Sequence, residues 1–159
     1  MTKGALHAAG WVLVGMVLMA LIVWFTMPSL MLIKHKSSRS YDDTVAVLSE
    51  ALKKKQDWRV LTINDYQKST AAFGAIERVG SMTICNPRYA SKILSPDANR
   101  GVTAFMPLGI GVYEDKKGQV YVSQLNVGLL GMMFGGTIAD VMGIAGKDLN
   151  EVVASVAVK

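Results

Sequence analysis

An uninterrupted apolar run near the N-terminus constrains this chain more than any other feature of its sequence. No Asp, Glu, Lys or Arg occurs between residues 4 and 33. Residues 8–27 are about as many as a helix rising 1.5 Å per residue needs to cross a ~30 Å hydrocarbon core. Trp11 and Trp24 stand near the two ends of this stretch, where aromatic rings favour the headgroup region. The run therefore predicts a single membrane-spanning helix, which we expect Pro28 to end.

The alternative for the apolar run is a secretory signal peptide that is removed after export. Such a peptide has a shorter apolar core and a small-x-small cleavage site. The residues after Phe25 are Thr26, Met27 and Pro28, which provide no such site. We therefore expect an uncleaved anchor and tail over residues 1–28 and a folded domain over residues 29–159.

The basic residues beside the apolar run bear on its orientation. Lys3 precedes the run, whereas Lys34, Lys36 and Arg39 follow it. The positive-inside rule applied to these counts places the domain in the cytoplasm. However, the alternation around Lys34 and Lys36 is that of a folded strand rather than of a flanking loop. The charges thus leave both orientations open.

The composition excludes several classes of protein. The chain has 159 residues, which suits one ordinary domain and excludes a multidomain enzyme. Its one cysteine excludes a disulfide framework within the chain. The net charge of +5 is dispersed except at residues 53–55. Beside a membrane anchor, dispersed basic charge indicates attraction to a membrane surface rather than nucleic-acid binding.

The periodicity of the remaining sequence predicts an α+β domain with an antiparallel sheet. Ser40 followed by Asp43 is typical of a helix start, and Leu48 and Leu52 recur at helical spacing after it. Asn86 before Pro87 is a second helix start. We expect strands over residues 31–37, 58–63, 79–84 and 119–125, and either one bent strand or two short ones over 102–106 and 109–114. We expect helices over 41–55, 88–94 and 147–156, and a loop or short helix over 64–74.

Residues 126–146 form a second apolar stretch, interrupted by glycines and by Asp140. A second membrane helix would place Asp140 in the bilayer at a high cost. A loop and helix start packed on the sheet is another interpretation. A third is an apolar surface that meets the bilayer or the membrane helices of a partner. The residues that we expect to make such contacts, together with Trp11 and Trp24, are Gly131, Met132, Met133, Phe134 and Gly135.

A succession of short motifs resembles a known family. A strand ending in Ile84-Cys85-Asn86-Pro87 is followed by Phe105-Met106-Pro107, then Val112-Tyr113-Glu114-Asp115 and Val122-Ser123. Over about residues 31–125 the chain resembles the bacterial and archaeal domain of unknown function 302 family. The resemblance implies a two-layer β-α-β-β-β-β-α fold that tends to form dimers. The family's biochemical activity is not established.

The chain departs from that family at two places. Many members carry a second cysteine directly after the proline, where this chain has Leu108, so no two-cysteine redox or metal role is expected within one chain. Residues 126–146 replace a short link before the last helix. Other members have a secretory signal peptide where this chain has its anchor. The resemblance therefore implies a bacterial inner-membrane protein with a periplasmic domain, with the cytoplasmic face as the alternative.

Cys85 is the most specific chemical candidate in the sequence. It lies at a predicted strand end beside a helix N-terminus, where the helix dipole favours a thiolate. A thiolate there would suit a nucleophile, a sulfur carrier or a ligand for a soft metal. The alternative is a small buried residue that closes the strand. His7 and His35 lie on opposite sides of the apolar run, and we expect Met132 and Met133 to fill apolar gaps rather than to bind copper or haem.

No Ser-His-Asp set, phosphate loop or paired-carboxylate motif is present in the sequence. We therefore expect a non-catalytic accessory subunit of a larger membrane complex, respiratory or photosynthetic. It would contact the lipid bilayer and an integral-membrane protein or a second copy of itself, with no cofactor and no nucleic acid. The alternative is a membrane-tethered thiol, sulfur or metal-handling protein that uses Cys85. A third candidate is a ligand-binding face on the sheet.

Overall fold

The computed structural model describes residues 3–158, which divide into a helix and a domain. The helix, α1 (Lys3–Met31), contains the apolar run, and the domain begins at Leu32. Within residues 3–158, one helix is long and apolar enough to cross a membrane, over Gly10–Met31. None of that segment is buried.

Pro28 does not end α1, so the prediction of a helix end there is wrong. The helix continues to Met31, and the domain boundary falls after Met31 rather than after Pro28. Proline removes one backbone hydrogen bond, and neighbouring hydroxyls can bond to carbonyl groups in the disturbed turn. Thr26 donates to the carbonyl of Ile22 at 2.8 Å, and Ser29 donates to that of Thr26 at 2.8 Å.

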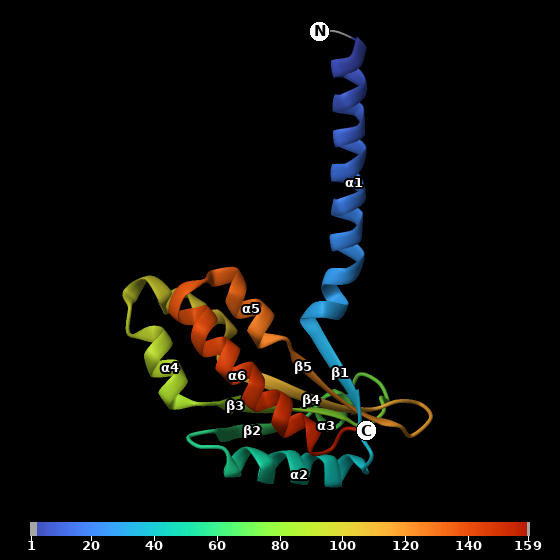
Figure 1. Ribbon diagram of the computed structural model, residues 1–159. Helices are drawn as coiled ribbons and strands as arrows, with labels where there is room; N and C mark the ends of the chain where they lie inside the picture. The colour runs from blue at the N-terminus through green and yellow to red at the C-terminus, as the bar shows by residue number, and fades with distance from the viewer. Residues whose placement is uncertain (1–2, 159) are drawn as a thin grey trace. The chain divides into compact units, whose positions relative to one another are not determined.

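Five antiparallel strands form the sheet of the domain (Figure 1). Their spatial order is β1-β5-β4-β3-β2, so the first and second strands occupy opposite edges. This arrangement confirms the predicted α+β class with an antiparallel sheet. The strands are β1 (Leu32–Lys36), β2 (Arg59–Asp65), β3 (Val79–Cys85), β4 (Leu108–Glu114) and β5 (Val120–Leu125).

Five helices and one 3-10 segment complete the domain. Helix α2 begins as the sequence predicts, since the Ser40 hydroxyl accepts the N–H of Asp43 at 3.2 Å and donates to its carboxylate at 2.7 Å. The helices are α2 (Tyr41–Lys54), α3 (Tyr66–Thr70), α4 (Pro87–Leu94), α5 (Val127–Phe134) and α6 (Gly136–Ala154), and the 3-10 segment is η1 (Asp97–Phe105).

The core lies between one face of the sheet and helices α2, α4 and α6. Alternate residues of the central strands point into it, as the burial of every second residue of β3 shows. Leu149, Val152 and Val153 of α6, and Val156 just after it, are all buried. The largest fully buried side chains of the strands and of α2 are Leu48, Leu52, Met82, Ile84, Ile110, Val112 and Val122.

Two predictions for the C-terminal half of the chain are wrong. Residues 102–106 do not form a strand, because most of them lie in η1, where Val102 is the buried residue. The last helix begins at Gly136 rather than at residue 147. Residues 126–146 are therefore mostly helical: α5 and the first half of α6 pack on each other. Asp140 is exposed on α6, so the domain tolerates its charge without burying it.

Candidate functional site

Cys85 ends strand β3 and is half-buried. The next residue, Asn86, caps α4: its side-chain oxygen accepts the N–H groups of Arg88 at 3.1 Å and Tyr89 at 3.2 Å. These N–H groups are therefore bonded to the asparagine and not to the sulfur. Burial raises the pKa of the Cys85 thiol, and the nearby positive charge of Arg59 opposes this only in part. The net shift of the pKa is therefore upward, opposite to the lowering expected from the helix start, and the protonated thiol is favoured.

A cavity of about 30 Å³ adjoins Cys85 between β3, α4 and α6. Its walls are mostly apolar, and include Ile93, Met106 and Met142. A cavity of this volume is too small for an organic ligand, and its mostly apolar lining offers water few hydrogen-bond partners. Leu108 lines the same cavity and pairs in register with Ile84, the neighbour of Cys85. The leucine thus occupies a position close to Cys85, at the place where a second cysteine would be needed for dithiol chemistry.

A polar cluster around Asp148 lies beside this cavity, and sequence reasoning missed it. One carboxylate oxygen of Asp148 accepts hydrogen bonds from the Trp58 indole at 3.0 Å and the Tyr89 hydroxyl at 2.9 Å. The other accepts from the Lys55 ammonium at 3.2 Å, and Lys55 also pairs with Glu151. Burial raises the pKa of Asp148, but the three donors outweigh burial and hold the pKa below its usual value. Both oxygens are engaged, so this carboxylate joins elements together rather than offering a free base.

The predicted contact surface of residues 131–135 separates into exposed and buried parts. Met132, Met133 and Phe134 are exposed at 66, 67 and 47%, and the ring of Phe134 meets the edge of Phe105, itself 42% exposed, at 5.7 Å between centroids. We call these four residues the apolar tip. Gly131 is instead buried, and a Cβ added there would lie 2.5 Å from the Cβ of Met142 on α6, so a larger residue would not fit without a shift.

Gly135, the last of the predicted contact residues, belongs to the turn between α5 and α6. Its φ of 71° and the φ of 50° at Gly136 lie in the left-handed region that glycine adopts without strain. This turn ends α5 directly after Phe134 and reverses the chain into α6.

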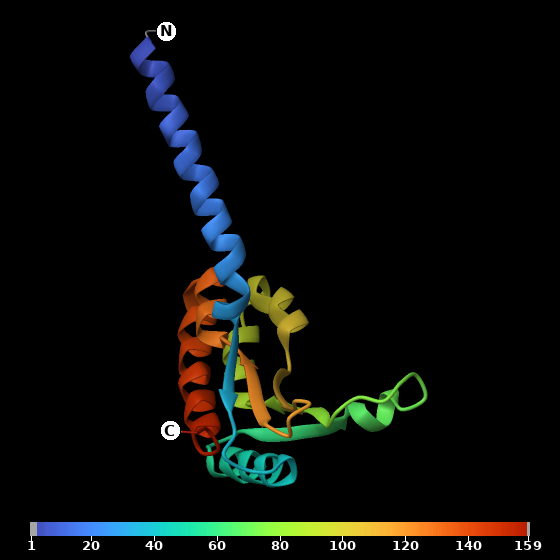
Figure 2. The same ribbon diagram turned by 90° about the vertical axis from the view of Figure 1, so that its right-hand side faces the viewer.

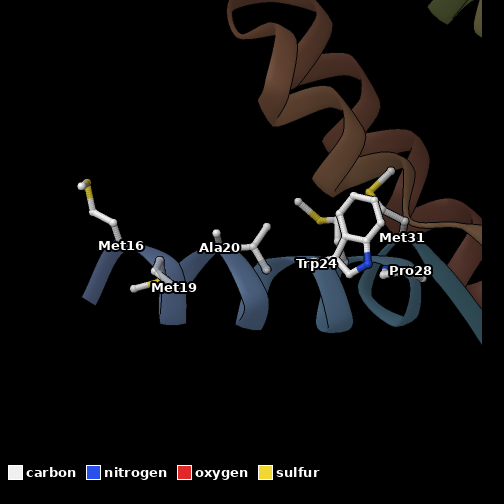
Figure 3. Close-up of a pocket in the computed structure, with 8 residues that line it drawn as sticks. Met16, Met19, Ala20, Trp24, Pro28 and Met31 are labelled. Carbon is white, nitrogen blue, oxygen red and sulfur yellow. The ribbon is translucent and has the colours of Figure 1, made fainter. Parts of the chain in front are cut away.

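The anchor helix α1 carries the remaining predicted contact residues. Trp11 and Trp24 are both largely exposed. Figure 3 shows side chains of α1 gathered on one face, where they line a shallow groove. The groove residues are Met16, Met19, Ala20, Val23, Trp24, Met27, Pro28 and Met31.

His7 lies on α1 and His35 on β1, on opposite sides of the apolar run in the sequence. Among residues 3–158, no three His, Cys, Asp or Glu side chains cluster in a way that could hold a metal ion.

The comparison with known families decides what kind of chain this is. The sequence pattern of the domain of unknown function DUF302 matches residues 33–156. The chain belongs to the DUF302 family. A solved structure, described as that of an uncharacterized conserved protein DUF302 from Bacillus stearothermophilus, is similar to it with a TM-score of 0.70 and 21% sequence identity. The similarity covers 80% of this chain and 99% of that chain and concerns the fold. No curated protein matches the chain.

The DUF302 match coincides with the domain and leaves α1 outside it. It begins at Ile33, one residue after the domain does. Family membership therefore accounts for the sheet and the helices packed on it. It supplies no activity, and the apolar helix is an addition to the part that the family pattern describes.

Proposed function

We propose that this DUF302 protein is a non-catalytic accessory subunit of a larger membrane complex, respiratory or photosynthetic, and is held there by a single span. The observation that carries the proposal is α1, whose segment Gly10–Met31 is apolar on all sides and has no buried residue. The apolar side chains of such a helix must be covered by lipid or by another protein rather than by water. The second apolar surface, on the domain, supports a role in contacts rather than in chemistry.

The groove on α1 supports contact with a membrane helix of the partner (Figure 3). Ala20 lies near its middle, and small residues allow two helices to approach closely within a bilayer. Methionine side chains such as Met16 and Met27 adapt to irregular neighbours. Leu18 and Ile22 lie on the opposite side of the helix, as the 3.6-residue period requires.

Purification from native membranes in mild detergent tests the accessory role. We expect the chain to remain with at least one integral-membrane protein in a fixed ratio through two different chromatographic steps. A chain that runs alone, or only as a homodimer, would contradict the proposal. The intact mass of the purified chain tests the anchor separately: about 17.2 kDa means that α1 is retained, whereas a mature chain lacking it would identify α1 as a signal sequence.

Photo-crosslinking tests the groove with a matched control. A photoreactive residue replacing Ala20 should form a covalent adduct with the co-purifying membrane protein. The same residue replacing Leu18 should label lipid instead. Equal adducts from both positions would contradict helix packing through the groove.

We further propose that the membrane is a bacterial inner membrane and that the domain lies on its periplasmic side. The support is the resemblance to family members that carry a secretory signal in the place of α1. Fusing alkaline phosphatase or a green fluorescent protein after residue 159 tests the side. An active phosphatase with a dark fluorescent fusion is the expected result, and the reverse would place the domain on the cytoplasmic face.

A further inference from the structure

Helix α1 connects directly to the first strand of the domain, with no linker between Met31 and Leu32. Met31 is the last residue of α1 and Leu32 is the first of β1, so one peptide bond joins them. Leu32 pairs in register with Leu125, the last residue of β5. Helix α5 then begins at Val127, close to the start of β1. In both Figure 1 and Figure 2, α5, η1 and the start of β1 lie at one end of the domain, and α2 lies at the other.

The apolar tip lies at this same end of the domain. Phe105 ends η1, and Met132, Met133 and Phe134 end α5. The sequence has no Asp, Glu, Lys or Arg between Arg100 and Glu114, or between Lys117 and Asp140. The tip is therefore uncharged as well as exposed.

The packing beneath the tip fixes its side chains outward. Val127, Leu130 and Gly131 of α5 are buried against α6, with Gly131 allowing close contact with Met142. One face of α5 is thus held in the domain, and its last turn presents two methionines and a phenylalanine away from it. The exposure belongs to a packed helix and not to a loose loop.

We propose that the apolar tip inserts into the surface of the bilayer that α1 spans. The inference rests on the proposed anchor, because the single peptide bond at Met31 then keeps the start of β1 at the membrane surface. Lipid is the occupant that the observations favour, since the tip is at the end of the domain where the chain leaves the span. Exposed Lys34, two residues into β1, adds attraction to anionic headgroups there.

Depth-dependent fluorescence quenching of the full chain in vesicles tests the insertion. The vesicles contain phosphatidylcholine and phosphatidylglycerol, and the single native cysteine is first removed by Cys85→Ser. A nitrobenzoxadiazole label on Met133→Cys reports the tip, and the same label on exposed Ala46→Cys in α2 is the matched control at the opposite end. Lipids brominated near the carbonyl end of their chains should quench the tip label more than lipids brominated near the chain end, because interfacial helices insert about 5–10 Å.

The outcomes separate the tip from the anchor and from the accessory role. Quenching at position 133 without quenching at position 46 supports the inference, and Met132→Glu should then remove the quenching at 133. Equal quenching of the labels at positions 133 and 46, in chains that float with the vesicles, overturns the inference and leaves the anchor intact. Chains that do not float with vesicles overturn the anchor and the inference with it. No partner protein is present in this experiment, so the accessory role is decided independently by co-purification.

Discussion

At the scale of single residues, Asp148 connects segments that are distant in sequence. Its carboxylate is bonded by Lys55, Trp58 and Tyr89, and its side chain is 21% exposed. Hydrogen bonds to a charged group contribute about 1.5–3 kcal/mol each, with large non-additivity. We expect Asp148→Asn to lower the free energy of unfolding by about 1–3 kcal/mol, measured by urea titration of the detergent-solubilised chain.

Glu151 provides the control, because it pairs with the same Lys55 but its side chain is 67% exposed. Glu151→Gln should cost less than about 1 kcal/mol. The pH dependence adds a second check. The pKa of Asp148 is lowered in the folded state, so its stabilisation is present above the unfolded pKa of about 3.9 and is lost as the pH falls through the folded value. Equal losses in the two variants at pH 7 would show that the cluster has no special role.

The thiol of Cys85 gives a prediction about reactivity. Burial raises its pKa, so the thiolate that reacts with alkylating agents is scarce at pH 7. We expect iodoacetamide to modify the native chain much more slowly than the urea-denatured chain, with a pH midpoint above the ordinary value of about 8.5. The modification is followed by intact mass. Native alkylation at pH 7 as fast as that of the unfolded chain would restore the thiol-chemistry alternative.

At the scale of elements, the contact between α5 and α6 depends on one glycine. A Cβ at Gly131 would lie 2.5 Å from the Cβ of Met142, so α5 must shift to admit an alanine. Gly131→Ala should therefore destabilise the domain by about 1–3 kcal/mol. Gly143→Ala, on α6 with nothing within 4 Å of the added Cβ, should instead stabilise it by up to about 1 kcal/mol. Urea titrations compare the two, and a neutral Gly131→Ala would show that the helices are not closely packed.

The elements that the sequence predicts well are those with local signals. The alternation of β3 and the capping of α2 by Ser40 and of α4 by Asn86 appear in the structure with small changes of boundary. These features depend on residues within one or two turns of each other. Periodicity alone predicted too many strands, because it assigned one to residues 102–106. The family resemblance implied the number of strands that the structure has.

The sequence predictions fail where contacts between residues far apart in the chain determine the structure. The glycines of residues 126–146 suggested a break, but Gly131 and Gly146 allow close approach of α5 and α6 inside helices. The Asp148 cluster draws on positions 55, 58, 89 and 148, and no local motif joins them. Met132 and Met133 are exposed rather than filling apolar gaps, and their predicted contact role stays a prediction. Gly131 could be assigned to the interior only from the packing.

At the scale of the whole molecule, the domain should fold without α1. Residues Leu32–Lys159 form a compact unit of their own. The similar DUF302 structure from Bacillus stearothermophilus is matched by this chain over 99% of its own length. A chain that starts at Leu32 after an initiator Met should keep a single cooperative thermal transition by circular dichroism. It should also leave the membrane fraction on an alkaline carbonate wash that the full chain survives. Loss of the cooperative transition would show that α1 is needed for folding.

The direct passage from α1 into β1 also determines how the domain can be released from its membrane. A protease needs several residues of accessible, extended backbone, and flexible loops usually provide them. Here the first residues after α1, including the basic Lys34 and Lys36, already pair with β5. Cutting at either lysine would take residues out of an edge strand of the sheet. Shedding of an intact soluble form is therefore disfavoured, and turnover of the domain should follow its unfolding rather than its exposure to proteases.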